Sequence, residues 1–250
     1  MNWHFIDSGF NTGLFNMQFD LELANKCSND EAFFRIYRWD PYCISIGANQ
    51  SFNDVNLEKT HRDGIDVVKR PTGGRAILHA EELTYSVIVP IKNGNSPKEL
   101  YHKISSALKK GLELYNPSLA SAELENIQPD LLQLLEKPMG ILCFASTAKN
   151  EVKFRGKKLI GSAQRKMKKS ILQHGSVLCS TGHRMLADYI NCDLPTRNNL
   201  SIELAEKTTE IETILHEKTD YDKLKKCLIN GFEIYWQINF ADSVNYYDRR

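Results

Sequence analysis

The 250-residue sequence predicts an α+β protein in which residues 1–250 form one domain, with a helical C-terminal segment from about residue 183 onward. Short β-branched and aromatic segments alternate with Gly and Pro in the first 90 residues and again between residues 151 and 179. Longer segments around residues 97–115 and after residue 183 carry apolar residues at helical spacing. No repeat or linker-like stretch separates these parts, so we expect strands and helices to share one folded unit.

The N-terminal half alternates between strand and helix patterns. Strands are predicted at residues 3–6, 33–37, 43–46, 65–69, 75–78 and 84–89, and helices at residues 14–24, 119–135 and 221–232. We expect the second and third strands to pair with each other around the turn at Trp39, Asp40 and Pro41. The polar residues 49–63 predict a loop with a short helix.

The clearest helix signal begins at Ser96. Serine is a good N-cap, Pro97 suits the first helical position, and Glu99 completes a capping box. An apolar stripe then runs to Tyr115, and Asn116 before a proline ends it. The spacing therefore predicts an amphipathic helix that packs one face against the core.

A second strand-rich region follows residue 150. Residues 151–154 and 158–164 read as strands joined across Gly156, and residues 171–179 pair back through a basic turn, Arg165 to Lys169. This turn is typical of a solvated hairpin tip, and it also suits a docking surface for an acidic carrier protein.

Composition excludes several classes of protein. The formal net charge is +1, with 42% apolar and 25% charged residues, so nothing indicates a nucleic-acid or membrane partner. We see no secretory signal and no apolar run near the roughly 20 residues that span a bilayer. The six cysteines are scattered without metal-ligand spacing, which predicts a cytoplasmic protein without disulfides or a metal site, and we expect a monomer.

Two consecutive glycines, Gly73 and Gly74, lie between strand-like segments and between two arginines, Arg70 and Arg75, and His79 follows one short strand later. A bare backbone beside guanidinium groups suits a carboxylate, a phosphate or a carbonyl that gains charge. The same residues also suit a glycine-rich hairpin turn with solvated arginines. Spacing alone leaves both interpretations open.

Two long segments carry a family resemblance. KRPTGGRAILHAEELTYSVI at residues 69–88 and GKKLIGSAQRKMKKSILQHGSVL at residues 156–178 resemble the catalytic domain shared by biotin ligases, lipoate-protein ligases and octanoyltransferases. FIDSG, NMQFD and RIYRWDPYCISIGANQ resemble the N-terminal part of this family, so the likeness covers about residues 1–185. It implies an α+β fold with two mixed or antiparallel β-sheets and packed helices. The acyl chain would lie in a tunnel beneath the Gly-Gly segment.

Within this family the chain is most similar to the cysteine-dependent octanoyltransferases. Cys143, followed by Phe144, lies where that subgroup carries its nucleophile, and Arg75 replaces a third glycine of many ligases. Without the resemblance, Cys143 between apolar neighbours is typical of a buried core residue. Lys158 matches the lysine of the family by its offset from Gly161, whereas Lys157 reads as a solvated turn residue.

The resemblance implies two catalytic residues, Cys143 and Lys158. It implies substrate contacts at Arg70, Gly73, Gly74, Arg75, His79, Gly161, Ser162, Ala163, His174 and Gly175. His79 and His174 also suit structural hydrogen-bonding histidines. The other five cysteines have no motif support, and we interpret them as core or incidental residues.

The implied mechanism is ping-pong acyl transfer. Cys143 takes an octanoyl or lipoyl group from acyl carrier protein as a thioester, with Lys158 stabilising the thiolate. A lysine of a lipoyl-type domain, such as glycine cleavage H protein or the E2 domain of a 2-oxoacid dehydrogenase, then attacks and gives an amide, and Lys158 takes its proton. Backbone N–H groups of residues 73–75 are candidate oxyanion donors. No cofactor is expected; ATP and magnesium enter only if the protein is a ligase.

Three alternatives stay open. The first is an ATP-dependent lipoate-protein ligase in which Lys158 holds an acyl-adenylate. The second is an amidotransferase that moves the acyl group between two lipoyl domains through the same cysteine. The third is a paralogue that binds lipoyl domains without modifying them. The presence of both Cys143 and Lys158 argues against the third.

Overall fold

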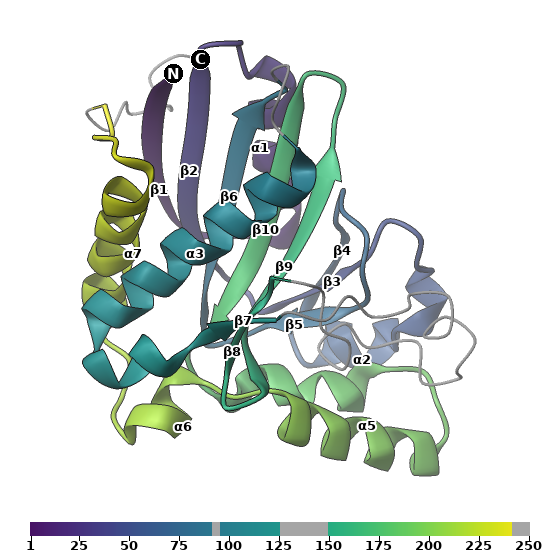
Figure 1. The fold of residues 1–250 in the computed structure, drawn as a ribbon. Coiled ribbons are helices and arrows are strands. Elements are labelled where there is room, and N and C mark those ends of the chain that lie inside the picture. The colour runs from purple at the N-terminus through teal and green to yellow at the C-terminus, as the bar shows by residue number, and fades with distance from the viewer. Residues whose placement is uncertain (92–95, 126–149, 242–250) are drawn as a thin grey trace.

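The computed structural model describes residues 1–91, 96–125 and 150–241 (Figure 1). The strands are β1 (Asn2–Asn11), β2 (Glu31–Trp39), β3 (Cys43–Ile46), β4 (Asp66–Lys69), β5 (Ile77–His79), β6 (Glu82–Pro90), β7 (Glu123–Leu124), β8 (Val152–Phe154), β9 (Lys157–Lys166) and β10 (Ser170–Leu178). The α-helices are α1 (Gly13–Lys26), α2 (Leu57–Arg62), α3 (Pro97–Tyr115), α5 (Leu194–Lys207), α6 (Ile211–Leu215) and α7 (Tyr221–Trp236). Short 3-10 helices are η1 (Phe52–Asp54), η2 (Pro117–Ser121) and η3 (Thr181–Tyr189).

The described strands form two sheets. The larger has seven strands in the order β1-β2-β6-β10-β9-β8-β7, with β1 parallel to β2 and the other neighbours antiparallel. The smaller has three strands in the order β4-β3-β5, with β3 parallel to β4 and antiparallel to β5. The predicted α+β class with two mixed sheets is confirmed.

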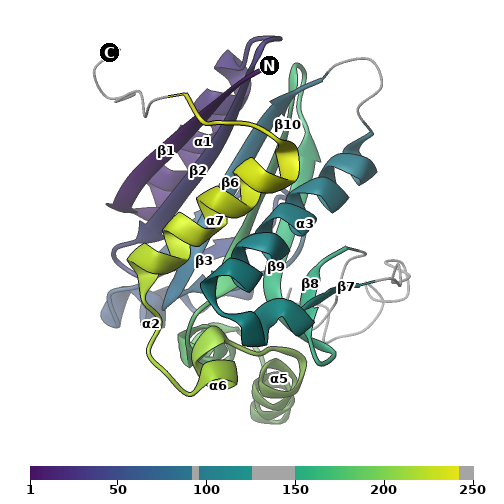
Figure 2. The same cartoon turned by 60° about the vertical axis from the view of Figure 1, so that its left-hand side comes forward.

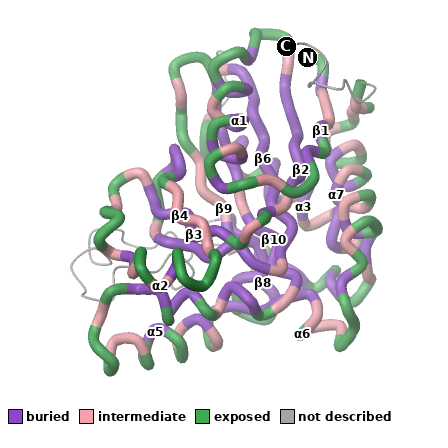
Figure 3. Tube along the Cα trace, turned by 180° about the vertical axis from the view of Figure 1, so that it is seen from behind, coloured by how far each residue is buried: buried purple, intermediate pink, exposed green. Residues whose placement is uncertain are grey.

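Helices cover the larger sheet on both faces. α3 and α7 lie side by side across one face (Figure 2), while α1 and the smaller sheet lie against the other (Figures 1 and 3). The face under α3 and α7 is apolar: Ile36, Val87 and Val177 of the sheet share a core with Leu108 and Phe232 of these helices. This face of the sheet therefore contributes to the main apolar core of the protein.

The opposite face of the same strands is polar and buried. Arg35, Ser86 and Ser176 alternate along their strands with the apolar residues Ile36, Val87 and Val177, and the three polar residues are at most 1% exposed. Buried polar groups need hydrogen-bond partners, so this layer must be satisfied by α1 and by the smaller sheet.

The predicted pairing of residues 33–37 with residues 43–46 is wrong. β2 has β1 and β6 as its two neighbours, so both of its edges are already paired. β3 lies in the other sheet between β4 and β5, and the chain passes from one sheet to the other through a cis peptide bond at Asp40-Pro41.

The hairpin interpretation of Gly73 and Gly74 is also wrong. β4 and β5, the strands on either side of the glycines, do not pair with each other, because β3 lies between them. Residues 70–76 therefore cross from one edge of the smaller sheet to the other, which places the Gly-Gly segment over the end of β3.

Two helix predictions also differ from the structure. The described part of residues 119–135 is the end of η2 followed by the edge strand β7, and the remainder lies outside the described residues. Asn116 caps η2 by accepting a hydrogen bond from the Ser118 amide, which ends α3 in a new turn. Ser96 has the extended backbone of an N-cap, but its side chain makes no capping hydrogen bond, so the predicted capping box is absent.

Within the described ranges, no helix is both long enough and apolar enough to cross a membrane.

Gly231 in α7 allows this helix to contact α3. A Cβ at this position would lie 2.4 Å from the Gly111 nitrogen and 2.7 Å from the Ala107 oxygen. Alanine is favoured over glycine in a helix by about 1 kcal/mol, but this overlap with backbone atoms outweighs the gain. Gly231→Ala should therefore lower the free energy of unfolding by roughly 1–3 kcal/mol, measured by chemical denaturation. Ile234→Ala, an exposed position on the same helix, is the control, and a stabilised Gly231→Ala would contradict the packing described here.

Candidate functional site

A pocket lies between the two sheets, on the polar face of the larger one. Together with its open mouth it holds about 430 Å³. The pocket is lined by Met17, Tyr37, Trp39, Ser45, Arg70, Ile77, His79, Thr84, Glu151, Lys158, Gly161, Ser162, Ala163, His174, Gly175 and Ser176. Eight of the predicted site residues are in this set: Arg70, His79, Lys158, Gly161, Ser162, Ala163, His174 and Gly175.

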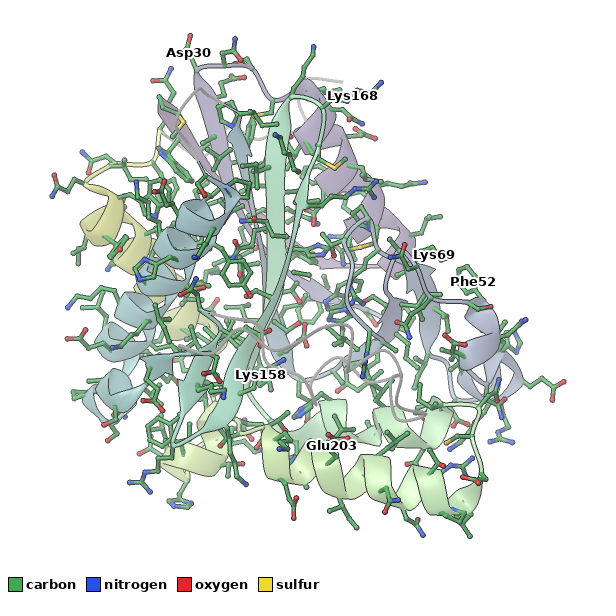
Figure 4. The ribbon with its side chains drawn as sticks, turned by 45° about the vertical axis from the view of Figure 1, so that its right-hand side comes forward. Asp30, Phe52, Lys69, Lys158, Lys168 and Glu203 are labelled. Carbon is green, nitrogen blue, oxygen red and sulfur yellow. The ribbon has the colours of Figure 1, made fainter. Side chains whose placement is uncertain are left out.

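Lys158 lines the pocket and is almost fully buried. It lies near the start of β9, at the lower end of this strand in Figure 4. Its Nζ lies 3.0 Å from Oε2 of Glu151, which is also buried. The other carboxylate oxygen of Glu151 accepts a hydrogen bond from the Ser162 amide at 3.3 Å. The backbone of Lys158 is fixed from behind, where its carbonyl accepts a hydrogen bond from the Thr209 amide at 2.9 Å. A buried ion pair thus forms part of the pocket wall.

Gly175 on β10 lets the neighbouring strand approach closely. A Cβ there would lie 2.3 Å from the Gly161 oxygen and 2.8 Å from Ser162 Oγ. The Ser162 hydroxyl in turn lies 2.7 Å from the hydroxyl of Tyr85, and burial raises the pKa of Tyr85 to about 12. Three of the predicted substrate residues therefore shape one stretch of the pocket wall.

Arg70 holds the Gly-Gly segment in place. Its buried guanidinium donates hydrogen bonds to the carbonyl oxygens of Ser45 at 2.8 Å, Gly73 at 2.9 Å and Arg75 at 2.6 Å. Gly74 has a positive φ of 88°. The carbonyl oxygen of Gly74 lies close to Gly47, so that a Cβ on Gly47 would be only 1.9 Å from this oxygen. These hydrogen bonds indicate that Arg70 stabilises the conformation of the loop. Gly73 and Gly74 are exposed.

His174 links this segment to the buried polar layer. Its Nε2 lies 2.6 Å from Thr72 Oγ1, and its Nδ1 lies 3.5 Å from Asp20 of α1. Asp20 forms a fully buried ion pair with Arg35 at 2.8 Å. Burial lowers the pKa of His174 against the opposing effect of Asp20. Burial alone would raise the pKa of Asp20, but Arg35 and His174 outweigh it and hold that pKa below its ordinary value.

His79 forms a second hydrogen-bonded chain. Its Nε2 lies 2.7 Å from Ser45 Oγ, and its Nδ1 lies 2.8 Å from Oε1 of the buried Glu82. The imidazole stacks on Trp39 at 4.1 Å between ring centroids. Burial opposes ionisation of Glu82, but His79 and two hydroxyl donors lower its pKa. These contacts fix the ring, so His79 presents a defined surface to the pocket.

Cys143, the predicted nucleophile, lies outside the described residues. Among the described cysteines, Cys27, Cys43 and Cys179 are buried. Burial raises the pKa of the Cys27 thiol to about 11, which disfavours the thiolate. The described residues contain no group of three or more His, Cys, Asp or Glu side chains that could hold a metal ion.

Sequence analysis missed Glu151, Asp20 and Gly47. Glu151 directly precedes β8, which pairs with β9, so an acidic residue across the turn from Lys158 was an available signal. Asp20 lies one helical turn after another polar residue, Asn16, on the buried side of α1. The contact between Gly47 and Gly74 joins residues 27 positions apart and has no local pattern.

Comparison with known proteins agrees with the fold and the motifs. Residues 12–233 match the lipoyl protein ligase A/B catalytic domain family. The octanoyltransferase LipM of Clostridioides difficile is 32% identical over 96% of this chain and 89% of its own length. The LipM of Bacillus subtilis is 32% identical over 92% of this chain and 85% of its own length.

Solved structures show the same fold. A crystal structure of lipoate-protein ligase A bound with ATP has a TM-score of 0.77 at 20% identity, over 100% of this chain and 92% of that one. A putative lipoate protein ligase from Thermoplasma acidophilum with bound lipoic acid has a TM-score of 0.75 at 19% identity, with the same coverage.

The lowered pKa of His174 has a consequence for stability. Because unfolded histidine binds a proton near pH 6.5 and folded His174 does so only at lower pH, acidification favours the unfolded state. The free energy of unfolding should thus fall as the pH falls from about 7 to about 5, and His174→Gln should show a smaller fall. Gln173→Asn, at the adjacent and non-titrating position, should keep the wild-type slope. Equal slopes for His174→Gln and wild type, in urea denaturation at each pH, would refute this role of His174.

Proposed function

Because this chain belongs to the lipoyl protein ligase A/B catalytic domain family, we propose that it is an octanoyltransferase acting in protein lipoylation. The observation that carries the proposal is the buried Lys158 in the pocket wall, at the position that the sequence motif assigns to a catalytic lysine. The LipM relatives, similar over almost the whole chain, support the same activity.

The first half-reaction loads the enzyme. The Cys143 thiolate attacks the thioester of octanoyl-acyl carrier protein, a C–S bond forms to Cys143, and the carrier leaves as its thiolate. The ammonium of Lys158 favours the Cys143 thiolate, since a nearby cation lowers the pKa of a thiol. The apolar side chains of Met17, Trp39 and Ile77 supply a surface on which the acyl chain can bury.

The second half-reaction modifies a carrier domain. A lysine ε-amine of a lipoyl-type domain attacks the enzyme thioester, and the product is an amide. One relative in fold was solved as a bi-partite lipoate protein ligase with its E2 lipoyl domain. Exchange of one thioester for another is nearly balanced in energy, and the amide makes the second step favourable, so the proposed reaction needs no ATP.

Intact mass spectrometry tests this function. The purified protein, incubated with octanoyl-acyl carrier protein without ATP, should gain an octanoyl adduct that hydroxylamine removes. Cys143→Ala should gain none, whereas Cys192→Ala, at a partly exposed cysteine outside the pocket, should gain it as wild type does. If no adduct formed, and an acceptor domain was modified only with free acid and ATP, the protein would be a ligase.

The basic hairpin tip offers a docking surface for an acidic carrier. Lys166, Lys168 and Lys169 are exposed there, and Figure 4 shows Lys168 at the opposite end of the β9–β10 hairpin from Lys158. Lys158 and Lys166 are both in β9, which places them about 26 Å apart at 3.3 Å per residue. A carrier domain of ordinary size can span this distance, so one bound carrier can contact both ends.

Charge reversal tests the docking surface. Lys166→Glu combined with Lys168→Glu should raise the KM for octanoyl-acyl carrier protein roughly tenfold at low salt and flatten its salt dependence, with kcat changed little. Lys226→Glu, an exposed lysine on α7 on the other side of the larger sheet, is the matched control. An unchanged salt dependence in the double variant would exclude the hairpin tip as the docking surface.

A further inference from the structure

We propose that the protein has a second ligand site, separate from the pocket between the two sheets, which binds a carboxylate that carries a short apolar chain. The site is a hollow between β1, β2 and the start of α7, and together with its open mouth it holds about 600 Å³. Its central residue is Arg38 of β2. The inference is independent of the proposed function, because it uses neither the acyl pocket nor the predicted nucleophile.

Arg38 lies on the face of the larger sheet opposite the pocket already described. Side chains alternate along a strand, so Arg38 shares a face with Ile36, which is part of the core beneath α3 and α7. Tyr37, between these two residues, is the one described residue that lines both the pocket and the hollow. The two sites are therefore on opposite sides of β2.

Two aromatic rings orient the guanidinium of Arg38. Its Cζ lies 3.7 Å from the centroid of the Tyr221 ring at the start of α7 and 4.5 Å from that of the Phe10 ring on β1. Phe10 pairs with Arg38 after a β-bulge that follows Asp7, and Gly9 within this bulge has a positive φ of 62°. These cation–π contacts hold the guanidinium in place without giving its N–H groups an oxygen acceptor.

The carboxylates that line the hollow are engaged by a different cation. Lys225 Nζ lies 2.7 Å from Asp7 Oδ2 and 3.2 Å from Asp222 Oδ1. The other oxygen of Asp7 accepts a hydrogen bond from the Gly9 amide at 3.1 Å. Within the described ranges, no carboxylate pairs with the half-buried Arg38 guanidinium and no oxygen accepts a hydrogen bond from it.

An oriented guanidinium with unused donors recognises an anion. Its planar fork of N–H groups matches the two oxygens of a carboxylate, and such bidentate pairs are among the stronger hydrogen-bonded contacts in proteins. The hollow is lined by two cationic side chains, Arg38 and Lys225, and two anionic ones, Asp7 and Asp222, so their formal charges cancel. This balance favours a monoanion over a phosphate dianion, which the two aspartates would repel.

The remaining lining indicates what the carboxylate is attached to. Ile36 and Leu83 line the hollow and are only 1% and 3% exposed, so they form its inner end. The Phe10 ring lies at the outer end and is 57% exposed. A short alkyl chain would cover this apolar surface while its carboxylate contacts Arg38. A medium-chain fatty acid has this combination of groups.

A titration of the full-length protein with octanoate, followed by the backbone amide NMR signals, tests the site. We expect saturable shifts at residues 36–38 and 221–225. Octanamide has nearly the same shape but no charge, so it should bind there at least roughly tenfold more weakly, as expected for the loss of charged hydrogen bonds. Acetate, which has the carboxylate without the chain, should also bind more weakly.

Variants assign the binding to Arg38. Arg38→Gln should weaken octanoate binding at residues 36–38 by roughly tenfold or more, and Arg38→Lys, which keeps the charge but not the fork, should weaken it less. Arg155→Gln is the matched control, because Arg155 is an exposed arginine over the Phe154 ring and does not line the hollow. Phe10→Ala, at an exposed position, is a second variant that should also weaken binding.

Three results would overturn the proposal. Shifts confined to residues 161–163 and 174–175 would show that octanoate enters only the pocket between the sheets. Equal affinities for octanoate and octanamide at residues 36–38 would show that the charge is not recognised. Unchanged octanoate binding in both Arg38→Gln and Phe10→Ala would show that the Arg38 cluster only joins α7 to the sheet.

Discussion

The fully buried ion pair between Arg35 and Asp20 is the constraint on which the polar side of this molecule depends. A guanidinium keeps its charge at any ordinary pH, so burying Arg35 within the larger sheet requires a charged partner. Asp20, once charged, accepts a hydrogen bond from Ser86 and orients His174. His174 in turn holds Thr72, so a charge inside the sheet fixes the position of the Gly-Gly segment at the surface.

The two faces of the larger sheet divide the tasks of stability and chemistry. Strand geometry points alternate residues to opposite faces, so a sequence such as Arg35-Ile36-Tyr37 contributes to both. The face beneath α3 and α7 forms an apolar core, which supplies hydrophobic stabilisation. The opposite face of the same strands consists of hydrogen-bonded polar groups. The smaller sheet lies over that polar face with a pocket between the sheets, and contacts of Arg70 and Gly47 position the loop that connects β4 and β5.

Sequence patterns predicted the elements better than their partners. Helical spacing located α1, α3 and α7, and the strand-rich segments located the β9–β10 hairpin, because these signals arise within a few neighbouring residues. The pairing of β3 with β4 and β5, and not with β2, depends on which edges are already occupied. The same limit applies in part to the site: a motif indicated Lys158, whereas its ion pair with Glu151 was not predicted, although an acidic residue across the β8–β9 turn was an available signal.

Two of the buried ion pairs among the described residues, Arg35–Asp20 and Lys158–Glu151, have different surroundings. Arg35 is hydrogen-bonded from several directions: besides Asp20, its guanidinium donates to Ser8 Oγ at 2.8 Å and to the Asn16 side chain at 2.6 Å, and it lies over the Tyr37 ring at 3.9 Å. Breaking any of these contacts would leave a buried group unsatisfied, so this pair is fixed. Lys158 and Glu151 instead line the pocket between the two sheets. The Arg35–Asp20 pair positions the side chains of the polar layer around it, such as Ser86 and His174. The Lys158–Glu151 pair borders the pocket, so its charges contribute to the electrostatic environment of that pocket.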